Sequence, residues 1–220
     1  MAVAPVNKFL TVAVPVAPGT QKLYEVPTGV SSILLFAQVS NVGIAATYPT
    51  VTLWHRRTSR STNNSRDIRI IKDVQIPPND AVVLVDGRLV LEKDATKVDP
   101  VYINAVQTGI VTITNCTYDE PTGICTITTS TEHGFSVDDP ITMSGLEFTC
   151  PGGSGITTTI FPSPQASYVV DSIVDTVGTS KTFTCNVGTA AGIQHTYVSG
   201  GLVGPLQMEF IASVLENSTT

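Results

Sequence analysis

The chain has 220 residues, of which 42% are hydrophobic and 14% are charged, so it can bury a sizeable core and is not a disordered tail. Its formal net charge of −6 argues against a general nucleic-acid-binding protein. No stretch is long and apolar enough to span a membrane, and the proline-interrupted N-terminal segment lacks the charged start of a secretory signal.

Short apolar blocks, separated by Gly, Pro, Asn and Asp at intervals of about ten residues, predict an all-β fold. In the first part of the chain we expect strands at 9–17, 21–26, 31–39, 50–57, 66–76, 81–85, 88–91 and 101–106. Pro18-Gly19 predicts a reversal of the chain, and Asp86-Gly87 between two β-branched runs predicts a two-residue hairpin. This pattern favours an N-terminal β-sandwich of the jelly-roll or immunoglobulin-like kind.

The amino-acid composition changes near Gly109. Residues 107–204 are rich in Thr and hold one of the 12 bases but eight of the 18 acids. We expect short antiparallel strands there, at 110–117, 123–129, 140–144, 167–174, 181–187 and 195–198. A well-alternating strand at 205–216 then matches the first part. We therefore predict a sandwich made of 1–106 plus 205–220, with 107–204 inserted as a small antiparallel β domain. Two domains in series are the alternative.

All four cysteines lie in the middle part: Cys116, Cys125, Cys150 and Cys185. Without a secretory signal, free thiols are the default expectation. Cys116 and Cys125 flank a turn, so a disulfide across a hairpin is the alternative for this pair. The spacings fit none of the usual zinc patterns, and we expect neither a metal nor a cofactor.

The segment STEHGFSVDDP, residues 130–140, concentrates side chains used in acid–base or metal chemistry, namely Glu132, His133, Asp138 and Asp139. Two turns around an apolar plug, Phe135, explain the same residues. Gly134 would supply a positive φ, and one of the aspartates would cap backbone donors. Because adjacent residues of a strand point to opposite faces, the two aspartates are poorly placed to share one ion. No nucleophile or phosphate-loop motif is present, and we expect no catalytic residue.

Half of the bases lie in one segment that links two expected strands: Arg56, Arg57, Arg60, Arg66, Arg69 and Lys72. Its polar sequence predicts a mobile hairpin arm. Three interpretations stay open: a solvated loop, a docking arm for an acidic neighbouring subunit such as the middle part of another copy, and a phosphate contact. The docking interpretation makes these six side chains a protein–protein contact.

Two sets of motifs resemble known modules. QKLYEVPTG (21–29), SSILLFAQVSNV (31–42) and IKDVQIPPNDAVVLVDGRLVLEKDA (71–95) resemble a β-sandwich module of tailed-bacteriophage virion proteins, closed by a final strand like MEFIASVLE (208–216). TITTSTEHGFSVDDPITMSGLEFTC (126–150), KTFTCNVGT (181–189) and HTYVSGG (195–201) resemble a Thr/Gly-rich module of structural and fibre proteins of marine cyanobacterial myophages. The chain departs from that module at Asp139, where Gly is usual.

The resemblance implies a non-enzymatic virion structural protein, assembled in the host cytoplasm, that is an accessory component of the capsid surface, neck or tail. It would dock by its sandwich domain and self-associate, with other virion proteins as partners and no role for nucleic acid or membrane. The first alternative is a receptor- or glycan-binding fibre module that contacts a host surface glycan through the loop 150–165 and Tyr168 or Tyr197. The second is a hydrolase of surface polysaccharide that uses Glu132 or Asp138.

Overall fold

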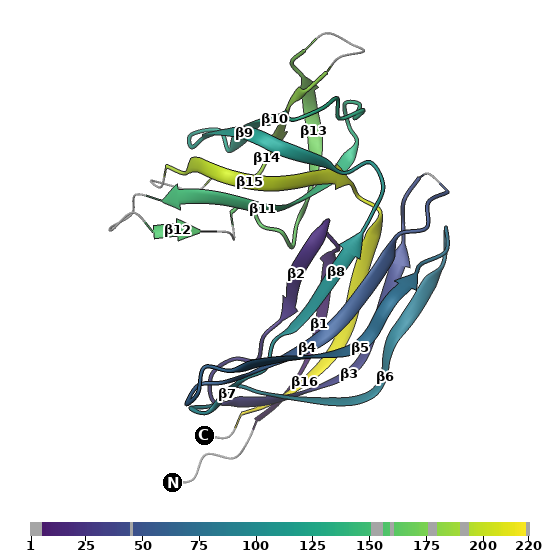
Figure 1. Ribbon diagram of the computed structural model, residues 1–220, viewed down its shortest axis with the longest axis vertical. Helices are drawn as coiled ribbons and strands as arrows, with labels where there is room; N and C mark the ends of the chain where they lie inside the picture. Colours follow the sequence, from purple (N-terminus) through teal and green to yellow (C-terminus); the bar gives the residue numbers. More distant parts are fainter. Residues whose placement is uncertain are drawn as a thin grey trace. The chain divides into compact units, whose positions relative to one another are not determined.

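The structure, a computed structural model, describes residues 6–44, 46–150, 156–158, 161–175, 180–189 and 194–218. Every regular element in these residues is a β-strand, and the strands form three sheets (Figure 1). The prediction of an all-β fold is therefore confirmed. In the same residues there is no helix that is long and apolar enough to cross a membrane.

The chain divides into two compact units. Unit 1 comprises Met1–Val16, Thr20–Val106 and Gln207–Thr220, and unit 2 comprises Ala17–Gly19 and Gln107–Leu206. Each unit has a hydrophobic core of its own. The chain thus leaves unit 1 after Val106 and returns to it at Gln207, two residues later than the sequence predicts. Whether either part folds alone stays a prediction.

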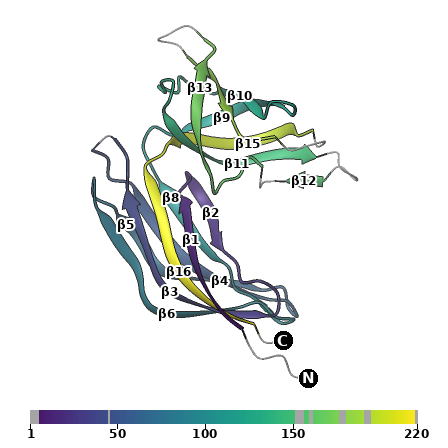
Figure 2. The ribbon, with the colours of Figure 1, turned by 180° about the vertical axis from the view of Figure 1, so that it is seen from behind.

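Unit 1 contains two sheets, in which the strands are ordered as follows. Sheet A has the order β1 (Val6–Pro15), β16 (Met208–Ser218), β3 (Val30–Asn41) and β6 (Ala81–Glu92). Sheet B has the order β2 (Gly19–Tyr24), β8 (Val101–Val106), β4 (Thr50–Ser59) and β5 (Ser65–Gln75), and β7 (Lys97–Val98) pairs with β4. Strand β16 is antiparallel to both β1 and β3, so a distant part of the sequence lies inside sheet A (Figure 2).

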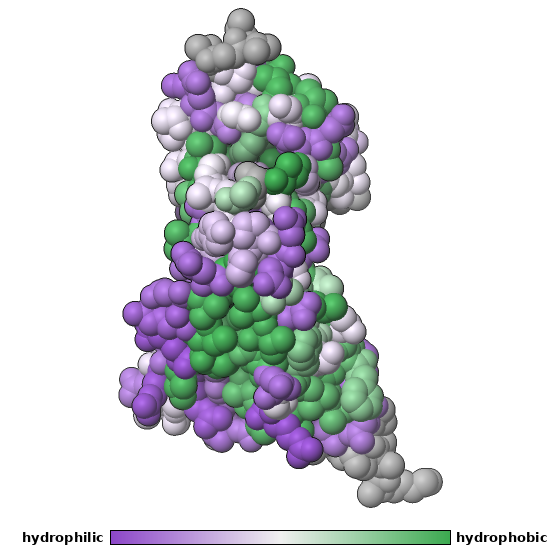
Figure 3. All heavy atoms as spheres, turned by 90° about the vertical axis from the view of Figure 1, so that its right-hand side faces the viewer, coloured by the Kyte–Doolittle hydropathy of each residue, from purple (hydrophilic) through white to green (hydrophobic). Residues whose placement is uncertain are grey.

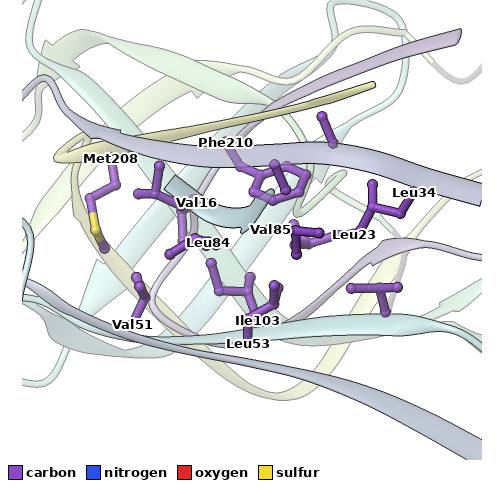
Figure 4. Close-up of a cluster of buried hydrophobic side chains, with 14 of the residues drawn as sticks. Val16, Leu23, Leu34, Val51, Leu53, Leu84, Val85, Ile103, Met208 and Phe210 are labelled. Atoms are coloured by element: carbon purple, nitrogen blue, oxygen red, sulfur yellow. The ribbon is translucent and has the colours of Figure 1, made fainter. Parts of the chain in front are cut away.

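Sheets A and B share one core. Along β16 the residues alternate between buried and exposed, because successive side chains of a strand point to opposite faces. Phe210 of β16 meets Leu34 of β3, Leu53 of β4 and Ile103 of β8 in the same buried cluster (Figure 4). The core therefore receives side chains from both sheets. The finer assignment as a jelly roll or an immunoglobulin-like sandwich stays a prediction.

Unit 2 is a small barrel. Its strands are β9 (Val111–Asp119), β10 (Ile124–Thr129), β11 (Pro140–Cys150), β12 (Ile156–Thr158), β13 (Ser167–Ile173), β14 (Thr182–Asn186) and β15 (Thr196–Pro205). Their order is β12-β11-β13-β14-β10-β9-β15, and β15 also pairs with β11. This last pairing closes a ring of six strands, which removes the free edges of the sheet. Phe148 and Phe183 are fully buried in its core.

Two local predictions were wrong, and glycine explains both. Asp86-Gly87 is not a hairpin, because β6 continues through it and pairs with β3 on both sides of an irregularity. Gly87 has φ of +149°, which lets the strand pass this point without reversing. The Gly-rich passage before residue 205 belongs to β15. A side chain at Gly201 would lie 2.8 Å from Cγ of Leu146, so glycine here permits close packing instead of ending the strand.

Candidate docking surface

The basic segment folds as a regular β-hairpin, as the sequence predicts, and its mobility stays a prediction. Strand β4 runs to Ser59 and β5 starts at Ser65, and Ser59 N donates a hydrogen bond of 2.9 Å to the carbonyl oxygen of Asn64. In the turn, Asn63 adopts φ of 53°, a left-handed conformation that asparagine tolerates well. Of the six predicted docking residues only Arg60 lies in the turn, and the others extend along the two strands.

Arg56 is held by groups of unit 1 itself. Its Nε and Nη2 donate to Oδ1 and Oδ2 of Asp67 at 2.6 and 2.8 Å. Its guanidinium carbon lies 4.9 Å from the ring centre of Tyr102, which in turn stacks on Trp54 at 5.6 Å. The hydrogen bonds from Arg56 lower the pKa of the Asp67 carboxyl, so this pair stays ionised. Through its contacts with Asp67 and Tyr102, Arg56 thus stabilises the outer face of sheet B.

Arg57 neutralises a carboxylate inside unit 1. Its Nη2 donates a 3.1 Å hydrogen bond to Oδ2 of Asp99, whose side chain is fully buried. The Nε2 atom of His55 lies 3.7 Å from the same oxygen. Burial lowers the pKa of His55, an effect that outweighs the opposing influence of Asp99. Arg57 therefore stabilises unit 1, because among the described residues no other arginine or lysine lies within ion-pair distance of Asp99.

The remaining bases of the hairpin are exposed. Within the described part of the chain, no carboxylate lies within ion-pair distance of Arg60, Arg66 or Arg69, whereas Lys72 approaches Asp73 at 3.5 Å. Arg69 lies opposite Trp54 in the strand pairing. Of the six predicted residues, Arg56 and Arg57 thus stabilise unit 1, Lys72 lies near Asp73, and the other three, all arginines, offer positive charge at the surface.

A shallow hollow that Arg69 helps to line lies on the outer face of sheet B. Its lining includes Trp54, Thr52, Arg69 and Asn104. Its shape depends on a β-bulge at Asp73, which has φ of 51°. Thr52 Oγ1 donates to Asp73 Oδ1 and accepts from Asp73 N, both at 3.0 Å. The sequence signal for this hollow is the alternation of Thr52 and Trp54 with Val51 and Leu53, which belong to the core, and it did not lead to a predicted site.

The segment 130–140 forms the two turns expected from the sequence. Gly134 has φ of 69° and Asp138 has φ of 70°. Oδ2 of Asp139 accepts a 2.7 Å hydrogen bond from Ser136 N, which caps the second turn. Asp138 N donates to the carbonyl oxygen of Val170 at 2.9 Å, which ties this turn to β13.

Aromatic rings fix the first of these turns. His133 is buried, and its ring lies 5.0 Å from Phe135 and 5.1 Å from Phe183, measured between ring centres. Nδ1 of His133 accepts a 3.0 Å hydrogen bond from Phe135 N, and burial lowers the pKa of His133. Glu132 is exposed. Among the described residues, no three His, Cys, Asp or Glu side chains gather as metal ligands.

Cys116, Cys125 and Cys185 are buried free thiols. Cys125 lies directly across from Cys185 of β14 and from Tyr118 of β9, whereas Cys116 lies opposite Ile127. A hydrogen bond with the Cys116 thiol, together with burial, raises the pKa of Cys125. A disulfide between Cys116 and Cys125 stays a prediction. The side chain of Cys150 lies outside the described residues.

The surface expected for glycan binding is only partly described, because residues 151–155 and 159–160 of the loop 150–165 lie outside the described residues. Tyr168 is buried, and its hydroxyl donates to the carbonyl oxygen of Ser163 at 3.0 Å. The half-buried Tyr197 donates to the carbonyl oxygen of Gly200 at 2.8 Å. Both hydroxyls are thus used within unit 2.

No family model and no curated protein matches the chain. Similar solved structures include the Gx strain of infectious bursal disease virus, at 8% identity over 99% of this chain with a TM-score of 0.33. The T13 viral particle of that virus matches at 8% identity over 100% with a TM-score of 0.33, and its VP2 subviral particle at 7% over 99% with 0.32. The chain spans 42%, 40% and 42% of these chains, respectively. Structural similarity at this level is too low to support a functional inference, so the comparisons assign the chain to no family.

Proposed function

We propose that the chain is a non-enzymatic structural protein of a tailed-phage virion, an accessory component of the capsid surface, neck or tail that docks by unit 1 and self-associates. In this proposal unit 1 is a jelly-roll or immunoglobulin-like sandwich, and unit 2 is a domain inserted into it. The sequence resemblance of both parts to virion modules supports the proposal. In this proposal the protein is assembled in the host cytoplasm and acts in the virus particle.

The observation that carries the docking role is the unpaired charge on the β4–β5 hairpin. Arg60, Arg66 and Arg69 are exposed on the hairpin, whose strands are linked to their surroundings by the Arg56–Asp67 and Arg57–Asp99 pairs. Three arginines that form no ion pair within the described residues suit an acidic surface on a neighbouring virion protein. Charges at an exposed interface mainly steer the encounter, so we expect docking to weaken as salt is raised.

The test replaces Arg60, Arg66 and Arg69 with glutamate in the virus that encodes the chain. Arg56 and Arg57 stay unchanged, because their loss would disturb unit 1 itself. The copy number of the protein in purified particles is then measured by quantitative mass spectrometry. We expect a large loss of incorporation, while the fluorescence of Trp54 confirms that unit 1 is folded.

A matched control isolates the position of the charge. Arg69→Glu and Lys181→Glu change the net charge equally, but Lys181 lies in unit 2, at an exposed position. Reduced incorporation of Arg69→Glu with normal incorporation of Lys181→Glu supports docking by the hairpin. Normal incorporation of the triple variant overturns the docking role, and absence of the wild-type chain from purified particles overturns the virion proposal.

A further inference from the structure

The outer face of sheet A carries a continuous apolar row across all four strands. Phe9 of β1 pairs with Leu215 of β16, Leu215 pairs with Ile33 of β3, and Ile33 pairs with Val90 of β6. Residues directly opposite each other in neighbouring strands point to the same face of a sheet. These four side chains therefore stand side by side, on the face opposite to the core.

A second row lies further along the strands, four residues away in β1 and β16. Ala13, Ile211, Gln38 and Val83 are aligned in the same way. Between the two rows, Phe36 of β3 is aligned with the polar residues Thr11, Ser213 and Asp86. The side chains of this face are absent from the core of unit 1.

Several of these side chains are open to solvent. The exposed fraction is 75% for Phe9, 51% for Val90, 47% for Val83 and 40% for Ile211. A broad hydrophobic area on unit 1 is visible in Figure 3. Isolated exposed apolar residues are common, but apolar side chains aligned in rows across a whole sheet mark an interaction surface.

Polar residues surround the apolar rows. At one end, Asn7, Asn217, Ser31 and Glu92 form a polar row, in which Asn217 Nδ2 donates to Asn7 Oδ1 at 2.8 Å. At the other end, Glu209 is exposed beside Ser40. The face thus combines apolar rows with polar positions between them and at both ends, a mixture that is usual in protein–protein interfaces.

The size of the face suits a dimer. Four strands spaced about 4.8 Å apart span about 19 Å, and ten residues of a strand span about 33 Å, which gives a face of about 600 Å². Covering it with an equal face removes about 1,200 Å² from water in total, which reaches the lower end of the range for specific and stable interfaces.

We propose that the outer face of sheet A binds the same face of a second copy of this chain, about a two-fold axis parallel to the strands. Such an axis places β1 of one copy over β6 of the other, because it exchanges the two edges of the sheet. Phe9, the bulkiest exposed side chain of this face, then lies over the smaller Val90 of the second copy. The large residue at one edge and the smaller residue at the other edge complement each other. The inference rests on the proposed function, which includes self-association, and names its surface.

The dissociation constant of the purified full chain tests this inference, measured by sedimentation equilibrium. We expect a dimer, and we expect Phe9→Glu combined with Val90→Glu to raise the dissociation constant about 100-fold or more, because four charges would be buried in an apolar contact. The matched control is Val169→Glu, at a valine of unit 2 that is 47% exposed. This control should dimerise as the wild type does, and Trp54 fluorescence verifies folding of all variants.

Cysteine cross-linking tests the axis. The double variant Phe9→Cys with Val90→Cys should form a covalent dimer on oxidation, whereas neither single variant should exceed the wild type. Dimers formed by Phe9→Cys alone would overturn the parallel axis. A wild-type chain that is monomeric at high concentration, or a glutamate variant that dimerises normally, would overturn the proposed face. Incorporation into particles is a separate measurement, so the virion role can be supported or overturned independently of the dimer face.

Discussion

Replacing Arg57 with methionine removes the cation that faces a fully buried carboxylate. Asp99 has an exposed fraction of 0%, and among the described residues nothing donates a hydrogen bond to its second oxygen, Oδ1. The Arg57 side chain supplies the hydrogen bond to Oδ2. Methionine keeps the unbranched apolar stem of the side chain, so the substitution removes the charge and the hydrogen bond while most of the packing of the stem is preserved.

The expected loss of stability follows from the exposed fractions of Arg57 and Asp99. Breaking a fully buried ion pair costs about 3–5 kcal/mol. Because Arg57 is 45% exposed, water can reach the carboxylate after the substitution, and we expect unit 1 to lose about 2 kcal/mol. Asp99→Asn removes the buried charge as well, so in the double variant the loss should be smaller than the sum of the single losses by about 1–2 kcal/mol.

Urea unfolding followed by Trp54 fluorescence measures these losses in unit 1. Trp54 is the only tryptophan of the chain, it is buried in β4, and unit 2 therefore contributes no tryptophan signal. The free energies of the wild type, both single variants and the double variant form one cycle. A loss below about 0.5 kcal/mol for Arg57→Met, or additive losses in the double variant, would refute the structural role of this arginine.

Three further predictions concern titration, turn capping and thiol reactivity. Burial keeps the pKa of His55 below its ordinary value of 6.5, so the unfolded chain binds more protons. The contribution of His55 to the free energy of unfolding of unit 1 should be fully present above about pH 6.5 and should be lost as the pH is lowered through the folded pKa. His55→Gln should make the free energy of unfolding less dependent on pH. Asp139→Ala should cost unit 2 about 1 kcal/mol and speed hydrogen exchange at the Ser136 amide; unchanged exchange would contradict the cap. A thiol reagent should leave Cys125 and Cys185 unmodified in the folded protein and modify them in urea, as measured by mass spectrometry.

Alternation along single strands made much of the fold predictable. Met208, Phe210, Ala212 and Val214 alternate with polar or exposed residues, and this pattern follows directly from one buried face. The turns around Phe135 were predictable for a similar reason, since glycine and aspartate act on their immediate neighbours. Local chemistry of this kind needs no knowledge of distant parts of the chain.

Features that depend on distant residues could not be predicted in this way. The hydrogen bond from Arg57 to Asp99 joins residues 42 positions apart, so the sequence shows two separate charges and no pair. Gly201 resembles a loop residue until Leu146 and Ile113 are seen to leave no room for a side chain. The apolar face of sheet A was missed because its residues, such as Phe9 and Val90, become neighbours only when the strands are aligned.

The position of β16 also has a consequence for synthesis of the chain. Strand β1 has one neighbour in sheet A, and that neighbour is β16. Asn7 and Asn217, which face each other across this pairing, are 210 positions apart. During translation, β1 and one edge of β3 therefore lack their partner strand β16 until the whole of unit 2 has been synthesised. A chain that stops before Met208 would leave both edges available to other polypeptides, so completion of sheet A separates a finished molecule from an aggregation-prone one.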